Sequence, residues 1–207
     1  MGTRNLTMVI NQEEEKKVAQ YGQWDGYPSG VGVGVLKFLK DKELFEKFKT
    51  NLSKVRFLDK DGVDKEFIES YNKNAPQWGD EPDNRTEEQK RWFSTYYSRD
   101  LAEKILTNIA NSADEEIILM DRENIAKDDD GRVKYSYVIN LKENTFGVYK
   151  CLDQEPMKVY KLDELPEEDV FVSELKAVEE EEDKWEDFFL FLFHESQSRS
   201  GGRQLKI

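Results

Sequence analysis

Residues Val18–Leu39 read VAQYGQWDGYPSGVGVGVLKFL, and the predicted fold is organised around this segment. Polar and apolar residues alternate loosely as far as Gln23, which predicts a strand. A polar and aromatic turn then leads to Pro28, a residue that is tolerated in the first turn of a helix. The glycines and apolar residues that follow predict this helix. The stretch is therefore predicted to be a strand, a corner and a helix in succession.

Strand patterns lie on both sides of this stretch. Leu6–Ile10 alternates as well and, together with Lys17–Gln23, predicts an antiparallel N-terminal hairpin. Further along the chain, the apolar run Ile117–Met120 predicts a buried strand. Three more segments predict a β-meander that complements the hairpin: Val133–Leu141, Phe146–Leu152 and Met157–Leu162.

Helical patterns occupy the middle of the chain. Apolar residues at helical spacing predict helices over Glu43–Val55, Asp64–Tyr71, Thr86–Tyr97 and about Ser98–Ala110. The segment Asn72–Arg85 holds two of the prolines and predicts a surface loop. Strands, then helices, then strands predict an α+β fold. In this fold an antiparallel sheet forms from the N-terminal hairpin and the later β-meander, with a central block of helices.

The character of the chain changes after Pro166. Two acidic runs, Glu167–Asp169 and Glu179–Asp183, surround a short predicted helix. We therefore predict an α+β domain over residues 1–166. Residues 167–207 are predicted to form an acidic and apolar C-terminal segment that ends in a flexible tail.

The most apolar run of the chain is Trp185–Phe193. A final buried helix or strand is the favoured interpretation of this run. The alternative is an interface, either between copies of this chain in a homo-oligomer or with a host protein. In that case the acidic flanks would steer the docking.

The net charge of the 207-residue chain is −13, from 44 acidic and 31 basic residues. Direct binding to nucleic acid is disfavoured, because contacts to the phosphate backbone need Lys and Arg. An acidic protein can instead engage a basic partner, such as the nucleic-acid-binding surface of another protein. Solubility is the favoured explanation of the charge.

Cys151 is the only cysteine, so no disulfide can form within the chain, which fits a reducing compartment. We expect it to be a small core residue. No apolar stretch approaches the roughly 20 residues that a membrane-spanning helix needs. The sequence therefore predicts a cytoplasmic protein with no membrane partner.

Metal and phosphate motifs are poorly represented. His194 is the only histidine and no cluster of Cys and His exists, so neither a metal nor a cofactor is predicted. Gly30, Gly32 and Gly34 are spaced by two and do not follow a phosphate-loop pattern. Close packing of the helix on the hairpin is favoured for them over an anion cradle of backbone amides.

The corner between strand and helix concentrates residues that can recognise a ligand. Trp24 and Tyr27 offer flat apolar faces that stack on rings, and Gln23 and Asp25 supply directed hydrogen bonds. The alternative is that the two rings fasten the hairpin to the helix. For Asp25, capping of the turn is favoured over acid–base catalysis.

Two N-terminal motifs are similar to those of a known family. The motifs are MGTR at Met1–Arg4 and WDGYP at Trp24–Pro28. They resemble a family of small uncharacterised phage and microbial proteins that begin Met-x-Thr-Arg and carry a Trp/Phe-Asp-Gly-Tyr-Pro turn. The resemblance covers roughly residues 1–40. It implies that Thr3 and Arg4 belong with the turn, and a phage setting implies interference with host defence. It carries no established activity.

Three functional hypotheses follow. The first is a non-enzymatic binding protein for a small polar or nucleotide-like ligand or for a host protein. Its predicted site comprises Thr3, Arg4, Tyr21, Gln23, Trp24, Asp25 and Tyr27. The second is a hydrolase-type or transferase-type enzyme that uses Asp25 with Arg4. The third is an acidic decoy of a nucleic-acid-binding protein, which depends on Glu179–Asp183.

Overall fold

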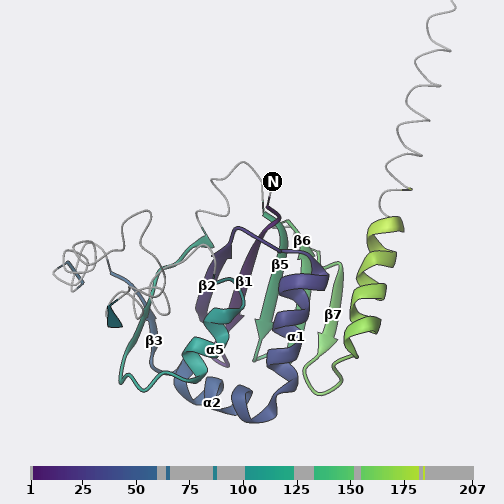
Figure 1. Cartoon of the computed structure of the whole chain (residues 1–207). Coiled ribbons are helices and arrows are strands. Elements are labelled where there is room, and N and C mark those ends of the chain that lie inside the picture. The colour runs from purple at the N-terminus through teal and green to yellow at the C-terminus, as the bar shows by residue number, and fades with distance from the viewer. Residues whose placement is uncertain are drawn as a thin grey trace, which may run out of the picture.

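The computed structural model describes residues 2–59, 64–65, 86–87, 101–123, 133–151, 155–181 and 184. Over these residues the chain forms two layers, a five-stranded sheet and a set of helices on one of its faces (Figure 1). This arrangement confirms the predicted α+β class. Most of the predicted segments over 60–100, and the apolar run Trp185–Phe193, lie outside the described residues.

The main sheet has the strand order β2-β1-β5-β6-β7. β1 (Arg4–Ile10) and β2 (Lys16–Gly22) form the predicted hairpin, and the later strands form the predicted meander. The later strands are β5 (Val133–Asn140), β6 (Thr145–Lys150) and β7 (Lys158–Lys161). One pairing departs from the antiparallel pattern, because β1 and β5 are parallel. A parallel pair needs a long crossover connection, and the helical middle of the chain supplies it.

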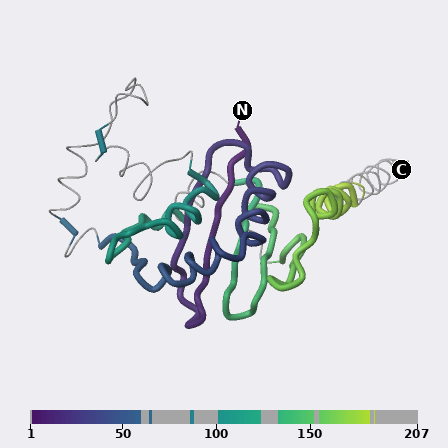
Figure 2. Tube along the Cα trace, turned by 60° about the horizontal axis from the view of Figure 1, so that its bottom comes forward, coloured from purple at the N-terminus to yellow at the C-terminus, as the bar shows by residue number. Residues whose placement is uncertain are grey.

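The helices lie across one face of the sheet, as the tube in Figure 2 also shows. η1 (Pro28–Gly32) is a short π-helix, and α1 (Val33–Lys40) continues it, so the predicted helix after the corner is confirmed. α2 (Lys42–Leu52) begins at once, because the Asp41 side chain caps its first turn by accepting a 3.0 Å hydrogen bond from the Leu44 amide.

Two further helices complete this layer. α5 (Lys104–Ala110) is shorter than the helix predicted from about Ser98. Ala102 has φ of 42°, a left-handed conformation that an α-helix cannot include. The predicted strand Phe146–Leu152 also ends early, because Cys151 has φ of 56° and follows the end of β6. Cys151 is half-buried and so is not a fully buried core residue. A further helix, over residues 168–181, includes the helix predicted within the acidic segment.

The predicted helix Glu43–Val55 is wrong at its C-terminal end. Val55 begins β3 (Val55–Phe57), which pairs in parallel with β4 (Ile117–Leu119) in a separate two-stranded sheet. The amide of Ile117 also donates a 2.9 Å hydrogen bond to the carbonyl of Lys54. Backbone groups here are therefore satisfied by a distant strand and not by a further helical turn.

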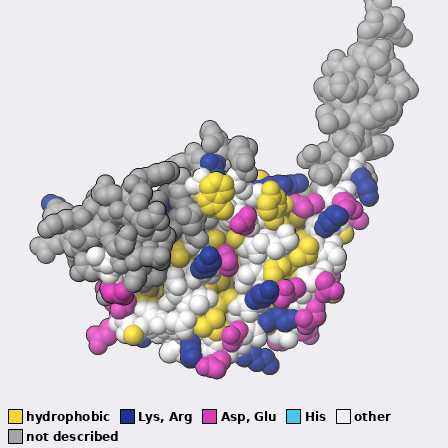
Figure 3. Space-filling view, in the orientation of Figure 1, with side chains coloured by type: hydrophobic (Ala, Val, Ile, Leu, Met, Phe, Trp, Pro, Cys, Tyr) yellow, Lys and Arg dark blue, Asp and Glu magenta, His cyan; other side chains and the backbone are white. Residues whose placement is uncertain are grey.

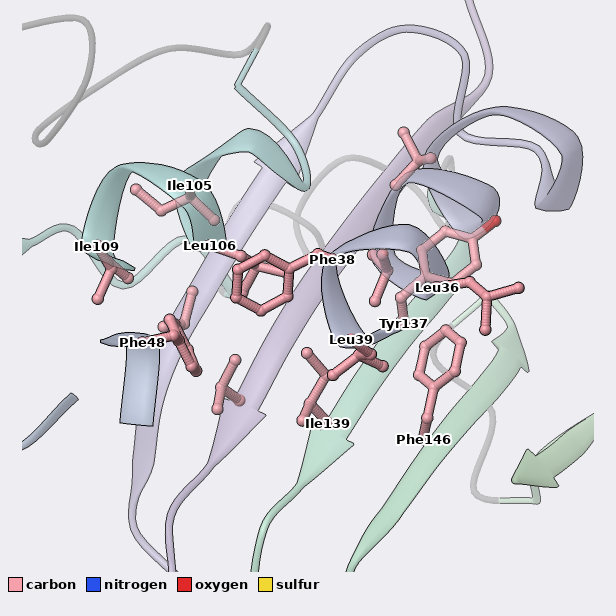
Figure 4. Packing of buried hydrophobic residues seen from close by; sticks show 14 of the residues in the cluster. Leu36, Phe38, Leu39, Phe48, Ile105, Leu106, Ile109, Tyr137, Ile139 and Phe146 are labelled. Atoms are coloured by element: carbon pink, nitrogen blue, oxygen red, sulfur yellow. The ribbon is translucent and has the colours of Figure 1, made fainter. Parts of the chain in front are cut away.

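The hydrophobic core lies between the main sheet and the helices (Figure 4). Strand register places five apolar residues in one row on the helix side of the sheet: Val18, Val9, Ile139, Phe146 and Tyr160. Leu36 and Phe38 of α1 pack into the same core. Phe171, from the helix over 168–181, stacks on Phe146 with ring centroids 5.8 Å apart. The described part of the predicted C-terminal segment therefore packs on the core of residues 1–166.

A guanidinium clamp ties the small sheet together. Arg56 in β3 donates to both carboxylate oxygens of Asp64, at 2.6 and 2.7 Å, and to Glu116 at 2.7 Å. Asp64 is buried and also accepts a 2.7 Å hydrogen bond from the Asp59 amide. The hydrogen bonds from Arg56 lower the pKa of the Asp64 carboxyl.

We expect this clamp to make folding sensitive to acid. Because the pKa of Asp64 is lower in the folded chain, its contribution to stability is complete above the unfolded value of about 3.9 and is lost as the pH falls through the lowered one. Thermal melting between pH 7 and pH 2 should therefore show a steeper acid loss in the wild type than in Asp64→Asn. Equal slopes would contradict the prediction.

Candidate functional site

The corner after β2 is held by backbone hydrogen bonds. The Gly26 amide donates to the Thr3 carbonyl at 2.9 Å, which joins the corner to the start of β1. The Val31 amide donates to the Asp25 carbonyl at 3.0 Å, and the amides of Gly30 and Gly32 donate to the Tyr27 carbonyl at 2.9 and 3.3 Å. The amides of residues 30–32 thus bond within the corner. Their use as an anion cradle is not supported.

The glycines of the first helical turns permit close approach, in line with the favoured interpretation. A Cβ on Gly30 would lie 2.3 Å from the carbonyl oxygen of Asp25. A Cβ on Gly32 would lie 2.9 Å from the ring of Tyr137, and one on Gly34 would lie 2.7 Å from Cγ of Glu103. The corner, strand β5 and the residue before α5 therefore pack against the backbone of η1 and α1.

An open cleft lies beside this corner, with a volume of about 490 Å³. The corner and η1 form one side, and the first residue of α5 with the two residues before it forms the other. The lining residues are Trp24, Asp25, Gly30, Val31, Ala102, Glu103 and Lys104. Trp24 is 53% exposed. On the face shown in Figure 3, hydrophobic, acidic and basic side chains lie close together toward the upper end.

Both sides of the cleft contain a residue in a left-handed backbone conformation. Asp25 has φ of 51° and Ala102 has φ of 42°. Non-glycine residues adopt such angles rarely, and they persist only where the surrounding structure enforces them. Functional sites are a common location for this kind of strain. The conformation of Ala102 also sets where the chain enters α5, and so where Glu103 and Lys104 lie.

The carboxyl group of Glu103 has a shifted pKa. Burial raises its pKa above the ordinary value of a glutamate, and the negative charge of Asp25 adds to the rise. The ammonium group of Lys104 opposes the shift. Two carboxylates and one ammonium group thus interact in a cleft with an aromatic side. A carboxyl whose pKa is perturbed by burial and by a charged neighbour is typical of a functional site.

A tyrosine layer supports the corner from the sheet. The Tyr137 hydroxyl donates a buried 2.8 Å hydrogen bond to the carbonyl of Gly26, and burial raises its pKa well above the usual value. Tyr135 stacks on Tyr137 with centroids 6.5 Å apart and packs against Tyr27 at 6.4 Å. The hydroxyl of Tyr135 donates to the carboxylate of Glu179. This glutamate, which the decoy hypothesis needs at the surface, is therefore engaged with the sheet.

Asn5 links the first strand to the corner. Its side chain is fully buried, and its Nδ2 donates a 3.3 Å hydrogen bond to the carbonyl of Trp24. Its Oδ1 has no hydrogen-bond partner among the described residues. A Cβ on Gly22 would lie within 2.8 Å of both this amide and the Cβ of Ala102, so Asn5 lies close to the side of the cleft that Ala102 forms.

The structure brings together part of the predicted site. Trp24 and Asp25 line the cleft, and Thr3 holds the corner through its carbonyl. Tyr27 is 46% exposed and packs on Tyr135, with the ammonium group of Lys134 over its ring at 5.8 Å. The ring of Tyr27 therefore packs on β5, and not between the hairpin and the helix as in the alternative, while nearly half of its surface stays open.

The other predicted residues lie away from the described lining of the cleft. Tyr21 is 1% exposed and belongs to a small second cluster with Leu6 and Val133, on the face of the sheet opposite to the helices. Side chains alternate along a strand, and the partner of Tyr21 in the register is Leu6, not a residue of the helix side. Arg4 and Gln23 are not among the described residues that line the cleft.

Sequence reasoning missed Ala102, Glu103 and Lys104. They lie about 80 positions after the corner, where the pattern predicts the interior of a helix. Nothing in the local sequence indicates that the helix starts at Lys104 or that Glu103 faces Asp25. Only the packing of α5 beside the corner reveals this side of the cleft.

Comparison of the chain with protein-family models, with curated proteins and with solved structures gave no match. The resemblance to phage and microbial proteins and the host partner therefore stay predictions. In the described part of the chain, no group of three or more His, Cys, Asp and Glu residues is arranged to hold a metal ion. No helix within the described ranges has the length and apolar character needed to cross a membrane.

Proposed function

We propose that the protein binds a small polar ligand with a planar ring, of nucleotide-like size, in the cleft between the corner and α5. The observation that carries this proposal is the combination of an exposed indole ring with two carboxylates in a space of about 490 Å³. Ligand sites typically have volumes of roughly 300–1,000 Å³ and combine apolar surface with a few polar groups. The indole face can stack on a ring, and the carboxylates can orient it.

Another, smaller cleft among the described residues fits such a ligand less well. It has a volume of about 220 Å³ and lies where the β1–β2 turn meets the end of α2. Its described lining includes Gln12, Lys49 and Leu52 but no aromatic side chain. The cleft at the corner is therefore the better candidate for binding a ring.

Replacing Trp24 should remove most of the affinity without unfolding the chain. Trp24 is 53% exposed, so Trp24→Ala leaves the core intact, whereas loss of a base-stacking ring costs about 1–3 kcal/mol. Isothermal titration with a panel of nucleosides and nucleotides should show at least a fivefold weaker Kd in Trp24→Ala. Trp24→Phe keeps an aromatic face and should recover part of the affinity.

Two results would contradict the proposal. One is the absence of binding by every member of the panel, and the other is unchanged affinity in Trp24→Ala. A useful control is Val159→Ala, because Val159 is also exposed but lies in β7, outside the described lining of the cleft. Its affinity and its melting temperature should match those of the wild type.

The pair of carboxylates supports a second candidate function, catalysis of hydrolase or transferase type. The predicted partner of Asp25 was Arg4, but Glu103 is the residue that shares the cleft with it. A carboxyl whose pKa is raised by burial can act as a general acid, and Glu103 has such a carboxyl. Turnover that Glu103→Gln abolishes while ligand binding and melting temperature persist would establish this function. Binding without turnover would exclude it.

A further inference from the structure

We infer that the cleft selects a ring whose edge presents adjacent N–H donors, as guanine does, and that Glu103 is the residue that reads this edge. The inference rests on the proposed function, since it names the class of ligand for the same cleft. It is carried by the side chains that line the cleft, which supply oxygen acceptors from Asp25 and Glu103 and an aromatic face from Trp24.

The polar groups of the cleft restrict the ligand. An ionised carboxylate only accepts hydrogen bonds, so two of them together require donors from whatever binds between or beside them. An uncharged ring whose polar edge consists of acceptors would leave these oxygens desolvated and unpaired, which is costly. The ammonium group of Lys104 can donate to these carboxylates as well, but a ligand that brings N–H groups to the acidic side of the cleft adds further donors and is favoured over one that brings acceptors.

Among the common nucleobases, guanine presents the matching edge. Its N1–H and its exocyclic N2–H point the same way, so one carboxylate can accept both in two parallel hydrogen bonds, as it does from arginine. Adenine presents one donor and one acceptor on the corresponding edge. Inosine keeps N1–H but lacks the exocyclic amino group, so it can make only one of the two bonds.

Glu103 is better suited than Asp25 to be the reading residue. Burial has already removed much water from its carboxylate, so it gains most from new donors. Asp25 is exposed and has the backbone strain of the corner. Lys104 follows Glu103 directly, on the same side of the cleft, where its ammonium group can attract a phosphate of the ligand.

The inference has a consequence for pH dependence. Asp25 from the corner, Lys104 from α5 and Tyr137 from β5 are the described groups that interact electrostatically with Glu103. Asp25 and burial raise its pKa in the free protein, whereas donors from a bound ring stabilise the ionised form. Affinity for guanosine, which has no phosphate to titrate, should therefore increase as the pH rises through this raised pKa.

The decisive experiment is isothermal titration of the full chain with GMP, IMP and AMP, and then of Glu103→Gln with the same three. We expect wild-type protein to bind GMP at least tenfold more tightly than AMP, with IMP between them. Glu103→Gln should lose this order, because an amide offers one acceptor and an unwanted donor. Glu115→Gln, at an exposed position outside the described lining, is the matched control and should keep the order.

Each result has a distinct meaning. AMP binding as tightly as GMP, or a preference for GMP that survives in Glu103→Gln, would overturn the inference and leave the proposed function standing. Binding of other panel members without GMP would also overturn the inference alone. The absence of binding by every nucleoside and nucleotide of the panel would overturn the proposed function itself. If Glu103→Gln melts at the same temperature as the wild type, its loss of selectivity is not caused by unfolding. Should that variant unfold, loss of guanosine affinity at low pH in the wild type provides the same test.

Discussion

Replacing Phe171 with alanine should lower the free energy of unfolding by about 3–5 kcal/mol, the cost expected for truncation of a buried aromatic ring. Phe171 is fully buried and lies 5.8 Å from the ring of Phe146 and 5.4 Å from that of Tyr160, measured between centroids. Alanine would leave a cavity between the helix over 168–181 and the sheet. The neighbouring rings belong to paired strands, so they can collapse into it only partly.

Urea denaturation followed by circular dichroism measures this loss. Val170→Ala is the control, because Val170 lies one residue earlier in the same helix but is 44% exposed. Its effect should stay within about 0.5 kcal/mol, as for most surface substitutions. A loss below about 1 kcal/mol for Phe171→Ala would mean that the helix over 168–181 contributes little to the core. The predicted division between residues 1–166 and 167–207 would then describe two units of unequal stability.

Gly30→Ala should have the second largest effect, a destabilisation of about 1–3 kcal/mol together with loss of ligand binding. The added methyl group would lie 2.3 Å from the carbonyl oxygen of Asp25, which is backbone and cannot rotate away. The same carbonyl accepts the hydrogen bond of the Val31 amide. To relieve the clash the corner would have to open, and Trp24 and Asp25 would move with it.

Gly34→Ala separates this steric effect from the general effect of losing a glycine. Its methyl group would meet Cγ of Glu103 at 2.7 Å, and a side chain can turn aside where backbone cannot. Gly34 lies within α1, where alanine gains up to about 1 kcal/mol of helix propensity. Melting temperature should therefore be kept or raised, while affinity falls because Glu103 is displaced. Equal destabilisation by both substitutions would contradict the role given to the Asp25 carbonyl.

Local pattern was sufficient for most of the strands and for the helix after the corner. Alternation placed β1, β2, β5, β6 and β7 within a few residues of their observed bounds, because each strand has one face on the core. The same approach failed at Val55, a β-branched residue that continues a helical pattern but bonds to a strand some 60 residues away. It also failed at Ala102, whose left-handed φ has no signature in the sequence.

Some residues of the candidate site could be predicted from local sequence and others could not. Trp24 and Asp25 could be found because unusual residues stand close together in the chain. Tyr21 does not line the cleft, although the alternation of side chains predicts that it shares a face with Asp25. This alternation holds only within a strand, and Asp25 lies beyond the end of β2 in a left-handed conformation. Glu103 and Lys104 could not be found, because their proximity to the corner depends on how α5 packs.

Local sequence pattern is enough to predict the α+β class, the hairpin, the meander and the position of the corner, since these depend on residues close together in the chain. Three features are known only from the folded chain: β1 and β5 pair in parallel, the helix over 168–181 packs into the core, and Glu103 lies across the cleft from the corner. These features bring together residues far apart in the chain. They are set by complementary packing of whole elements, which no local pattern records.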